Sequence, residues 1–302
     1  LIAGPGAMGL FLARRLSEVA DVALLHKGPA EAAALERTGF WVREGSAKVR
    51  LFLPVYHIPP AECDIVIITF KSYSFDSAAT ALSSCRPRLV LTVQNGLGNC
   101  EKLAQFFPPD SIYAASVTYG LSRSTPHEVE LRGEGKIELG PWSCGMAGTE
   151  LVSLLTSAGL RVEASCDIKA ALWLKIGVNA CINPLATLRN SSNGALLDDP
   201  ATLQAWEGIA GEVCAAASLD GATIDVATVV AAARQVATNT ADNICSMLQD
   251  VRAGRRTEVE AICGEVVRRL AAAGMCAPAC SELLDSIRAL LPDREISREK
   301  DA

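Results

Sequence analysis

The sequence predicts an α/β protein with an N-terminal Rossmann-type dinucleotide-binding domain and an all-α C-terminal domain. Up to about residue 165, short apolar runs alternate with helical patterns, which is the rhythm of βαβ units. Beyond that point, long Ala- and Leu-rich stretches with helical period replace the strand-like runs. We therefore expect a nucleotide-binding domain over residues 1–165 and a helical, substrate-binding domain over residues 166–302.

Bulk composition excludes several classes of protein. Half of the 302 residues are apolar, so the chain can bury a substantial core. The net charge of −6 is made of mixed charges without a basic stripe, which argues against nucleic acid as a partner. We find no uninterrupted apolar run of about 20 residues, the length that spans a bilayer. We expect a soluble, cytoplasmic protein that binds neither nucleic acid nor a membrane.

The 11 cysteines predict no metal site. They occur singly within helical or strand-like patterns, and the closest pair, Cys276 and Cys280, has no second pair and no histidines nearby. Free thiols that act as small buried apolar side chains in a reducing compartment account for them better.

The order of elements in the first domain follows from apolar runs and turn residues. We expect helices near residues 8–19, 29–37 and 75–84, and strands at 22–25, 39–43, 48–55, 65–68 and 89–93. The runs Ile65–Ile68 and Leu89–Val93 are almost entirely apolar, which is typical of parallel strands that are buried on both faces.

Less regular segments complete the first domain. Residues 128–132 and 136–139 flank Gly133-Glu134-Gly135 and predict a β-hairpin. The sheet is expected to end near Val162. Because the first apolar residues lead into glycine so quickly, we expect the first strand to begin before Leu1. Helices should then continue to about residue 291, followed by a charged tail that frays.

The segment Gly4-Pro5-Gly6-Ala7-Met8-Gly9 matches the G-x-G-x-x-G fingerprint of dinucleotide-binding proteins. In that motif the first glycine permits a tight turn, the second lets backbone approach a pyrophosphate, and the third allows close helix packing. The helix that follows would offer its first backbone amides to the phosphates. An ordinary structural turn is the alternative. The apolar run before it, the helix after it and a second strand ending about 20 residues on favour a cofactor site.

The second strand runs into Leu25-His26-Lys27, where NAD-binding proteins usually place a carboxylate for the ribose 2′-hydroxyl. No carboxylate stands there in this sequence. Lys27, together with His26, instead favours the 2′-phosphate of NADP, so NADP(H) is the expected cofactor. The alternative is that Lys27 is merely a solvated turn residue.

Two further strand ends offer polar side chains. Asn95 follows strand 89–93, at the edge where open α/β sheets bind their ligands, although Asn-Gly is also an ordinary turn dipeptide. Lys71 follows run 65–68 in the same way and faces either the cofactor or solvent. We treat both as candidate cofactor contacts.

Polar residues recur at every fourth position of the apolar segment 173–184, as Lys175, Asn179 and Asn183. In a helix this spacing puts them on one face. Surrounding apolar side chains would partly desolvate the Lys175 ammonium and lower its pKa toward the range useful for proton transfer. A snorkelling lysine with two helix-end amides is the structural alternative. The alignment of the three groups favours a site.

Purely structural roles could explain two more polar residues when each is considered alone. Ser246-Met247-Leu248-Gln249 predicts a capping box with Ser246 as the N-cap, although a cap can also present its hydroxyl to a ligand. Glu258 follows Arg255-Arg256-Thr257 and would by itself be one end of a surface ion pair.

Taken together, these motifs resemble the ketopantoate reductase (2-dehydropantoate 2-reductase) family. The resemblance covers nearly the whole chain and rests on four ordered motifs: Gly4–Gly9, Gln94-Asn95-Gly96, the Lys-x-x-x-Asn-x-x-x-Asn-Pro pattern of 175–184, and Ser246–Asp250 followed by Arg255–Glu258. It implies hydride transfer from NADPH to the ketone of 2-dehydropantoate, which gives (R)-pantoate for pantothenate and coenzyme A synthesis.

The resemblance also implies roles for individual residues. Lys175 is implied to be the general acid that protonates the nascent alkoxide, and Glu258 the carboxylate that anchors the substrate hydroxyl. Asn95 is implied to lie near nicotinamide and substrate. Neutral hydrogen bonds to the substrate carboxylate and hydroxyl are implied for Asn179, Asn183 and Ser246.

One departure from the family bears on the cofactor. The family often has arginine for the 2′-phosphate where this sequence has His26-Lys27, so the departure affects the cofactor preference rather than the reaction. Two other functions stay open: a related 2-oxoacid or β-hydroxyacid dehydrogenase with the same two-domain plan, and a redox sensor that binds NADP(H) without turnover. Retention of Lys175 and Glu258 argues against the sensor, which needs no proton donor. The oligomeric state is open, and a homodimer is one possibility.

Overall fold

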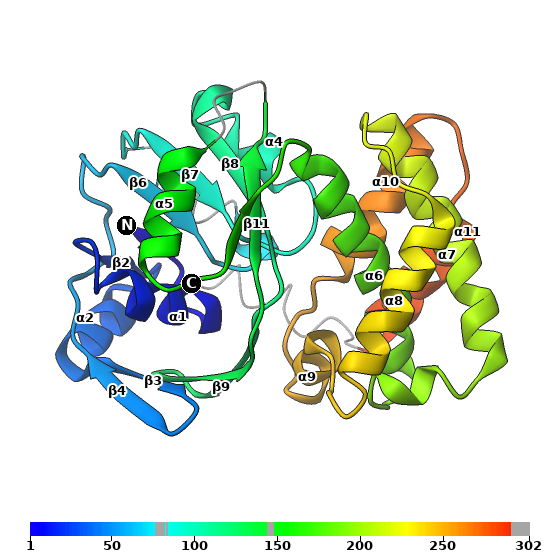
Figure 1. Cartoon of the computed structure of the whole chain (residues 1–302), viewed down its shortest axis with the longest axis horizontal. Helices are drawn as coiled ribbons and strands as arrows, with labels where there is room; N and C mark the ends of the chain where they lie inside the picture. The colour runs from blue at the N-terminus through cyan, green and yellow to red at the C-terminus, as the bar shows by residue number, and fades with distance from the viewer. Residues whose placement is uncertain (76–81, 83, 144–147, 291–302) are drawn as a thin grey trace. The chain divides into compact units, whose positions relative to one another are not determined.

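The computed structural model describes residues 1–75, 82, 84–143 and 148–290. The chain divides into two compact units, Leu1–Ile168 and Lys169–Ala302, drawn from blue to green and from green to red in Figure 1. Among the described residues, both sheets lie in the first unit and the second unit is helical. The predicted fold class, a Rossmann-type α/β domain followed by a helical domain, is confirmed.

An eight-stranded sheet forms the centre of the first unit. Its spatial order is β12 (Val162–Ala164), β11 (Ile137–Pro141), β8 (Ile112–Val117), β7 (Leu89–Thr92), β6 (Ile65–Ile68), β1 (Ile2–Ala3), β2 (Leu24–Leu25) and β5 (Val55–Tyr56). Neighbours from β8 to β5 pair in parallel, and β11 is antiparallel to β8. The strand order reverses at β1, between β2 and β6. That switch point is where open α/β sheets bind ligands, so the glycine turn after β1 lies in the expected place.

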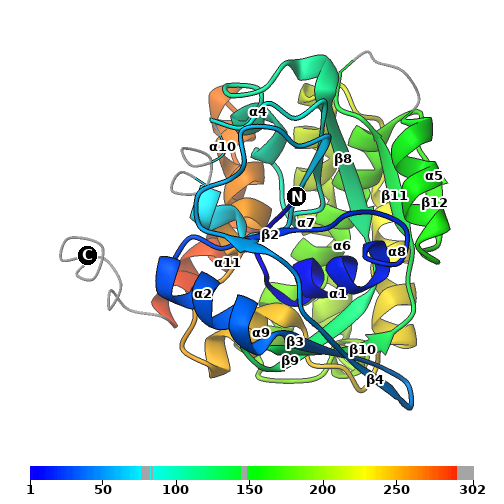
Figure 2. The same ribbon diagram turned by 90° about the vertical axis from the view of Figure 1, so that its left-hand side faces the viewer.

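A smaller sheet and several helices complete the first unit. The smaller sheet runs β4 (Ala47–Leu51), β3 (Phe40–Glu44), β10 (Glu128–Gly133), β9 (Gly120–Thr125). The α-helices of this unit are α1 (Ala7–Leu16), α2 (Pro29–Thr38), α4 (Asn99–Leu103) and α5 (Thr149–Ser157), and short 3₁₀ turns occur at Ser72–Ser74 and Pro109–Ser111. Figure 2 shows α1 running over β9 and β10, which it contacts, while its other side meets β1.

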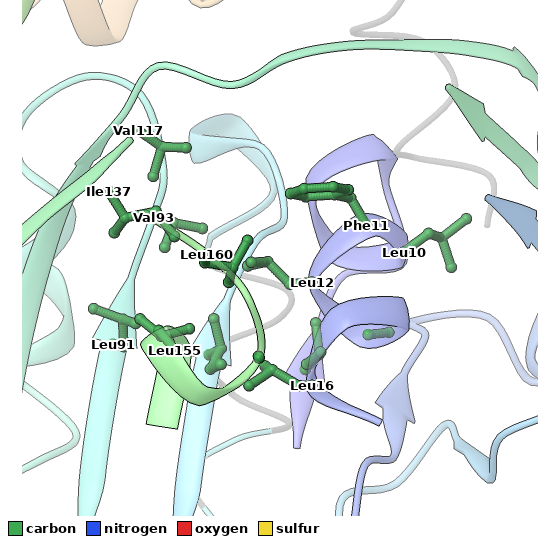
Figure 3. Close-up of a cluster of buried hydrophobic side chains, with 14 of the residues drawn as sticks. Leu10, Phe11, Leu12, Leu16, Leu91, Val93, Val117, Ile137, Leu155 and Leu160 are labelled. Carbon is green, nitrogen blue, oxygen red and sulfur yellow. The ribbon is translucent and has the colours of Figure 1, made fainter. Parts of the chain in front are cut away.

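The core of the first unit is an apolar cluster shared by these layers. Side chains of α1, β7 and α5 lie side by side in it, including Leu12, Leu91 and Leu155 (Figure 3). Phe11 of α1 also packs its ring 5.2 Å, between centroids, from that of Tyr119 at the edge of the smaller sheet. Because α1 is held on both sides, the turn at its amino end is fixed by a rigid core.

The predicted hairpin over residues 128–139 is wrong. Strand β10 pairs with β9 and β3 in the smaller sheet, whereas β11 belongs to the large sheet and pairs with β8. Gly135, between the two strands, allows a close approach of chains instead of a tight turn, because a Cβ there would stand 2.3 Å from the Tyr119 nitrogen. Strands β8 and β9 were not predicted from the sequence.

Other boundaries differ by smaller amounts. The strand expected over 48–55 is two strands in different sheets, β4 and β5, separated before Val55 by Pro54, which cannot donate a ladder hydrogen bond. The first helix ends at Leu16 rather than near residue 19. The helix expected over 75–84 falls mostly outside the described residues, as does the charged tail.

The second unit consists of α6 (Ile168–Leu188), which begins at the last residue of the first unit, α7 (Pro200–Leu219), α8 (Val226–Asn239), α9 (Ser246–Arg252), α10 (Glu265–Ala272) and α11 (Pro278–Ala289). A 3₁₀ turn covers Gly194–Leu196, and a π-helical turn, Glu260–Gly264, leads into α10. Two buried tryptophans anchor α6 to its neighbours. The indole nitrogen of Trp173 donates to Asp220 Oδ2 at 3.0 Å, and that of Trp206 donates to the Cys181 carbonyl at 2.8 Å.

Among the described residues, α6 is the one helix that is long and apolar enough to cross a membrane by length and composition. It contains no uninterrupted apolar run of that length, because Lys169 and Lys175 interrupt it. Of the apolar window, 61% is buried inside the protein, as in the core helix of a globular domain, which passes the same test.

Candidate active site

The three glycines of the turn after β1 differ in how much space a side chain would have. Gly4 has φ +106°, and a Cβ there would stand 2.5 Å from the Phe70 nitrogen. A Cβ on Gly9 would stand 2.2 Å from the Gly4 carbonyl oxygen. Around Gly6, in contrast, nothing lies within 4 Å of where a Cβ would be. Two of the glycines are therefore required by the fold, while Gly6 faces open space.

The amino end of α1 is suited to an anion. Gly6 is its N-cap and has no side chain to occupy the first backbone amides, which point along the helix axis at the positive end of the helix dipole. The first turn of α1 also carries no acidic side chain. Open space over Gly6 and uncapped amides together fit the pyrophosphate of a dinucleotide.

The loop after β2 holds His26 and Lys27. The His26 Nδ1 accepts a hydrogen bond from the Gly28 nitrogen at 3.0 Å, so this ring nitrogen stabilises the turn. Lys27 is exposed. A carboxylate does lie close to the turn, contrary to the sequence expectation, because Glu31 in the first turn of α2 folds back over Gly28: a Cβ on Gly28 would stand 2.1 Å from Glu31 Oε2.

The loops after β6 and β7 contain Lys71 and Asn95. Lys71 is partly buried and is the residue before the 3₁₀ turn Ser72–Ser74. The Asn95 carbonyl accepts hydrogen bonds from Ser72 Oγ at 2.8 Å and Asn99 Nδ2 at 3.4 Å. The backbone at Asn95 is therefore fixed from both sides.

Lys175 lies in the middle of α6. It is partly buried, while Trp173 and Ile176 beside it are fully buried. Burial lowers the pKa of the Lys175 ammonium to about 8, and the negative charge of Glu258 opposes this by raising it. The structure therefore brings Lys175 within electrostatic reach of Glu258, which sequence spacing did not predict.

Glu258 is a buried carboxylate, 8% exposed, rather than one end of a surface ion pair. It stands just before the helical segment that continues into the π-helical turn Glu260–Gly264, and its carbonyl accepts from the Ala261 nitrogen at 3.0 Å. A buried charge needs a partner of opposite sign, and Lys175 provides a positive charge nearby.

The carboxyl-terminal part of α6 meets the start of α9. The Cys245 thiol donates to the Asn183 carbonyl at 3.6 Å, and Thr187 Oγ1 donates to the same carbonyl at 2.7 Å. Asn183 and Ser246, next to Cys245, thus lie at one junction, while Asn179 occupies the turn of α6 between Lys175 and Asn183.

The predicted capping box at Ser246 is wrong by one residue. Cys245 is the N-cap, and its sulfur accepts a hydrogen bond from the Leu248 nitrogen at 3.4 Å. Gln249 reaches back to the Ile244 carbonyl instead of the cap nitrogen. Serine is preferred at N-caps because its side-chain oxygen is a good hydrogen-bond acceptor. Here the Cys245 thiol takes that position and also donates to the Asn183 carbonyl. Ser246 is the first helical residue and is exposed.

Asn193, in the loop after α6, is a buried polar residue that was not predicted from the sequence. It is 7% exposed, its Nδ2 donates to Thr240 Oγ1 at 2.9 Å, and its Oδ1 is buried without a hydrogen-bond partner among the described residues. The Asn193 nitrogen bonds the Asn243 carbonyl, two residues before the Cys245 cap. No sequence pattern predicts that Asn193 is buried, because it lies beyond the end of α6.

The described residues contain no group of three or more histidine, cysteine or acidic side chains that could hold a metal ion. The first unit offers a glycine turn suited to an anion, and the second offers a lysine of lowered pKa, a buried carboxylate and neutral amides. Such a set can bind an acid and supply a proton to a developing oxyanion.

Comparison with known proteins identifies the relatives of this chain. A family model described as "Ketopantoate reductase PanE/ApbA" matches residues 1–143, and one described as "Ketopantoate reductase PanE/ApbA C terminal" matches residues 167–291. The 2-dehydropantoate 2-reductase of Halobacterium salinarum is 32% identical over 95% of this chain and 97% of its own, and that of Bacillus subtilis is 30% identical over 96% of each.

Solved structures show the same fold. A 2-dehydropantoate 2-reductase of Geobacter metallireducens superposes with a TM-score of 0.87 at 27% identity, over 95% of this chain and 99% of that one. Two family models in chain order and full-length relatives of 30% identity or more leave one conclusion. The chain belongs to the ketopantoate reductase family of oxidoreductases.

Proposed function

We propose that this protein reduces 2-dehydropantoate to (R)-pantoate with NADPH, a step of pantothenate and coenzyme A biosynthesis. The observation that carries the proposal is Lys175, an amine of lowered pKa beside the buried carboxylate Glu258, on a helix that also bears Asn179 and Asn183. We assign cofactor binding to residues 1–165 and substrate binding to residues 166–302.

The first unit fits a dinucleotide. Open space over Gly6 and the uncapped amides of α1 would receive the pyrophosphate. Lys27 would supply positive charge for a 2′-phosphate, with His26 as a hydrogen-bonding neighbour, Lys71 would be a further cofactor contact, and Asn95 would contact the nicotinamide end. When it is bound, the reduced nicotinamide supplies a hydride to the ketone carbon.

The second unit would supply the proton. As the carbonyl carbon of the substrate gains a hydride, its oxygen becomes an alkoxide that must be protonated. Lys175 Nζ is the donor we assign, because a pKa of about 8 keeps most of the amine protonated at neutral pH while making it a stronger acid than an exposed lysine.

The remaining polar groups would bind and orient the substrate. Glu258 would accept a hydrogen bond from the substrate hydroxyl and, through its charge, hold the Lys175 ammonium in its protonated form. The neutral side chains Asn179, Asn183 and Ser246 would hold the substrate carboxylate without adding a second positive charge beside Lys175.

The decisive experiment follows NADPH oxidation by the full chain with 2-dehydropantoate and with a panel of other branched 2-oxoacids. The proposal expects 2-dehydropantoate to have the highest kcat/KM of the panel. A different best substrate would make the protein a related 2-oxoacid dehydrogenase. Failure to oxidise NADPH with every 2-oxoacid, while binding it, would support a non-catalytic sensor.

Cofactor preference has its own test because Lys27 and Glu31 carry opposite charges near one turn. Lys27 favours a 2′-phosphate, whereas a carboxylate such as Glu31 repels it. We expect NADPH to be preferred over NADH. Lys27→Ala should raise KM for NADPH with little change for NADH, and Glu31→Gln should lower KM for NADPH. A higher kcat/KM for NADH in the unaltered protein would refute the preference.

A further inference from the structure

A chain of buried and partly buried polar contacts connects the three strand ends that carry the cofactor turn, Lys71 and Asn95. It begins at the glycine turn, where Thr69 Oγ1 donates to the Gly4 carbonyl at 2.6 Å and the Phe70 nitrogen donates to the Ala3 carbonyl at 3.1 Å. The backbone of Phe70 also lies directly against Gly4, where a Cβ would stand 2.5 Å from the Phe70 nitrogen. The loop after β6 is therefore held against the turn after β1.

Gln94 extends this chain to the loop after β7. Its Nε2 donates to the Phe70 carbonyl at 2.8 Å, and its Oε1 accepts from Thr92 Oγ1 at 3.0 Å. Gln94 is 7% exposed, so both ends of its amide are satisfied inside the protein. Since Phe70 touches Gly4 and Gln94 precedes Asn95, this one side chain bridges the glycine turn and the Asn95 loop.

A second bond closes the network from the other side. Ser72 Oγ donates to the Asn95 carbonyl at 2.8 Å, two residues after Phe70. The segment Phe70–Ser72, which includes Lys71, thus contacts the Gln94-Asn95 dipeptide at both of its ends. Glutamine suits the bridging position because its amide can donate to Phe70 and accept from Thr92 at once, which no carboxylate or hydrocarbon side chain can do.

We infer that Gln94 is a positioning residue, which holds the Asn95 loop in register with the glycine turn so that the pyrophosphate and the nicotinamide of the cofactor are bound together. The inference rests on the proposed function, since it takes the Asn95 loop to contact nicotinamide. It predicts that Gln94 matters for the nicotinamide half of the cofactor and not for the phosphate half.

The test compares two ligands on the full chain: NADPH, and 2′-phospho-ADP-ribose, which lacks nicotinamide. Gln94→Met keeps the length of the side chain and removes both hydrogen bonds. It should weaken NADPH binding by about tenfold, the cost of one unsatisfied buried carbonyl, and leave the fragment within about twofold. Ser72→Ala removes the hydrogen bond to the Asn95 carbonyl and should give the same pattern. It serves as the second variant in case Gln94→Met fails to fold.

Val90→Ala is the matched control, because it opens a cavity in the same strand without touching the network. It should lower Tm while leaving the ratio of the two affinities unchanged. Equal weakening of NADPH and fragment in Gln94→Met and Ser72→Ala, or no weakening of either, would overturn the inference. An unaltered protein that binds neither ligand would instead refute the proposed function, and the inference with it.

Discussion

At the scale of single residues, two opposing influences set the acidity of Lys175. Transfer of an ammonium out of water lowers its pKa, and a nearby carboxylate raises it. Burial is the larger influence here, so the pKa is about 8 in spite of Glu258. Lys175 stands in a mainly apolar helical stretch, so the direction of the pKa shift could be predicted from the sequence. The partner could not, because Glu258 comes from a distant segment.

Replacing Lys175 with alanine should remove the proton donor and, with it, the positive charge near Glu258. General acid catalysis contributes roughly 10²–10⁴-fold, so kcat/KM for 2-dehydropantoate should fall by about 3–5 kcal/mol of transition-state stabilisation. The affinity for NADPH should stay nearly unchanged. Lys169→Ala is the control, a lysine of the same helix that pairs with Asp220 instead. Near-normal turnover in Lys175→Ala would mean that the proton comes from another group.

The pH dependence of activity should report the same lysine. A general acid must be protonated to act, so kcat/KM should fall as pH rises through about 8. Glu258 raises the pKa of Lys175, and Glu258→Gln should therefore move this alkaline limb to lower pH, in addition to raising KM for the substrate. The measurement is a pH profile for both proteins. A limb that stays in place, or moves to higher pH, would contradict the pairing.

At the scale of elements, sequence pattern predicts what local forces decide. The glycine spacing and the apolar period identify the turn and α1, and the buried runs identify β6 and β7. The pairing of β10 with β9 and β3 depends on tertiary contacts that no local pattern contains, and so the hairpin was misplaced. The cap of α9 was missed for a similar reason, since Cys245 is fixed by its contact with the carbonyl of Asn183.

Two substitutions in the glycine turn should have different effects on the free energy of unfolding and on the affinity for NADPH. Gly9→Ala should lower the free energy of unfolding by about 1–3 kcal/mol or more, because its Cβ would overlap the Gly4 carbonyl. Gly6→Ala meets open space at an allowed φ of −77° and should leave Tm almost unchanged. It should nevertheless weaken NADPH binding, because the methyl group occupies the space that we assign to the pyrophosphate.

Thermal unfolding and cofactor titration of both glycine variants make the comparison. Gly45→Ala, at a turn with φ +59° and far from the fingerprint in sequence, serves as a control for a glycine that is needed only for backbone conformation. Unimpaired NADPH binding by Gly6→Ala would show that the open space over this glycine is not the phosphate site.

At the scale of the whole molecule, the sequence predicts the architecture better than it predicts individual contacts. The change from strand-like runs to helical period indicates two kinds of architecture, and parallel strands bring Gly4, His26, Lys71 and Asn95 to one edge of the sheet because their carboxyl ends must share it. The hydrogen bonds of Gln94 could not be predicted, and neither could the Asn193 Oδ1, which has no hydrogen-bond partner among the described residues. Both depend on which buried groups meet after the helices and strands have packed.

If the first unit binds the cofactor and the second the substrate, hydrogen exchange should distinguish the two ligands. A ligand that binds the native state suppresses local opening around its site. NADPH alone should slow exchange of amides in Gly4–Leu10 and Asn95–Asn99, and addition of 2-dehydropantoate to the NADP⁺ complex should slow exchange in 175–183 and 245–250. Strand β4, exposed along most of its length, is the internal control and should not respond to either ligand. Protection by NADPH confined to residues 169–290 would contradict the assignment of the cofactor to the glycine turn.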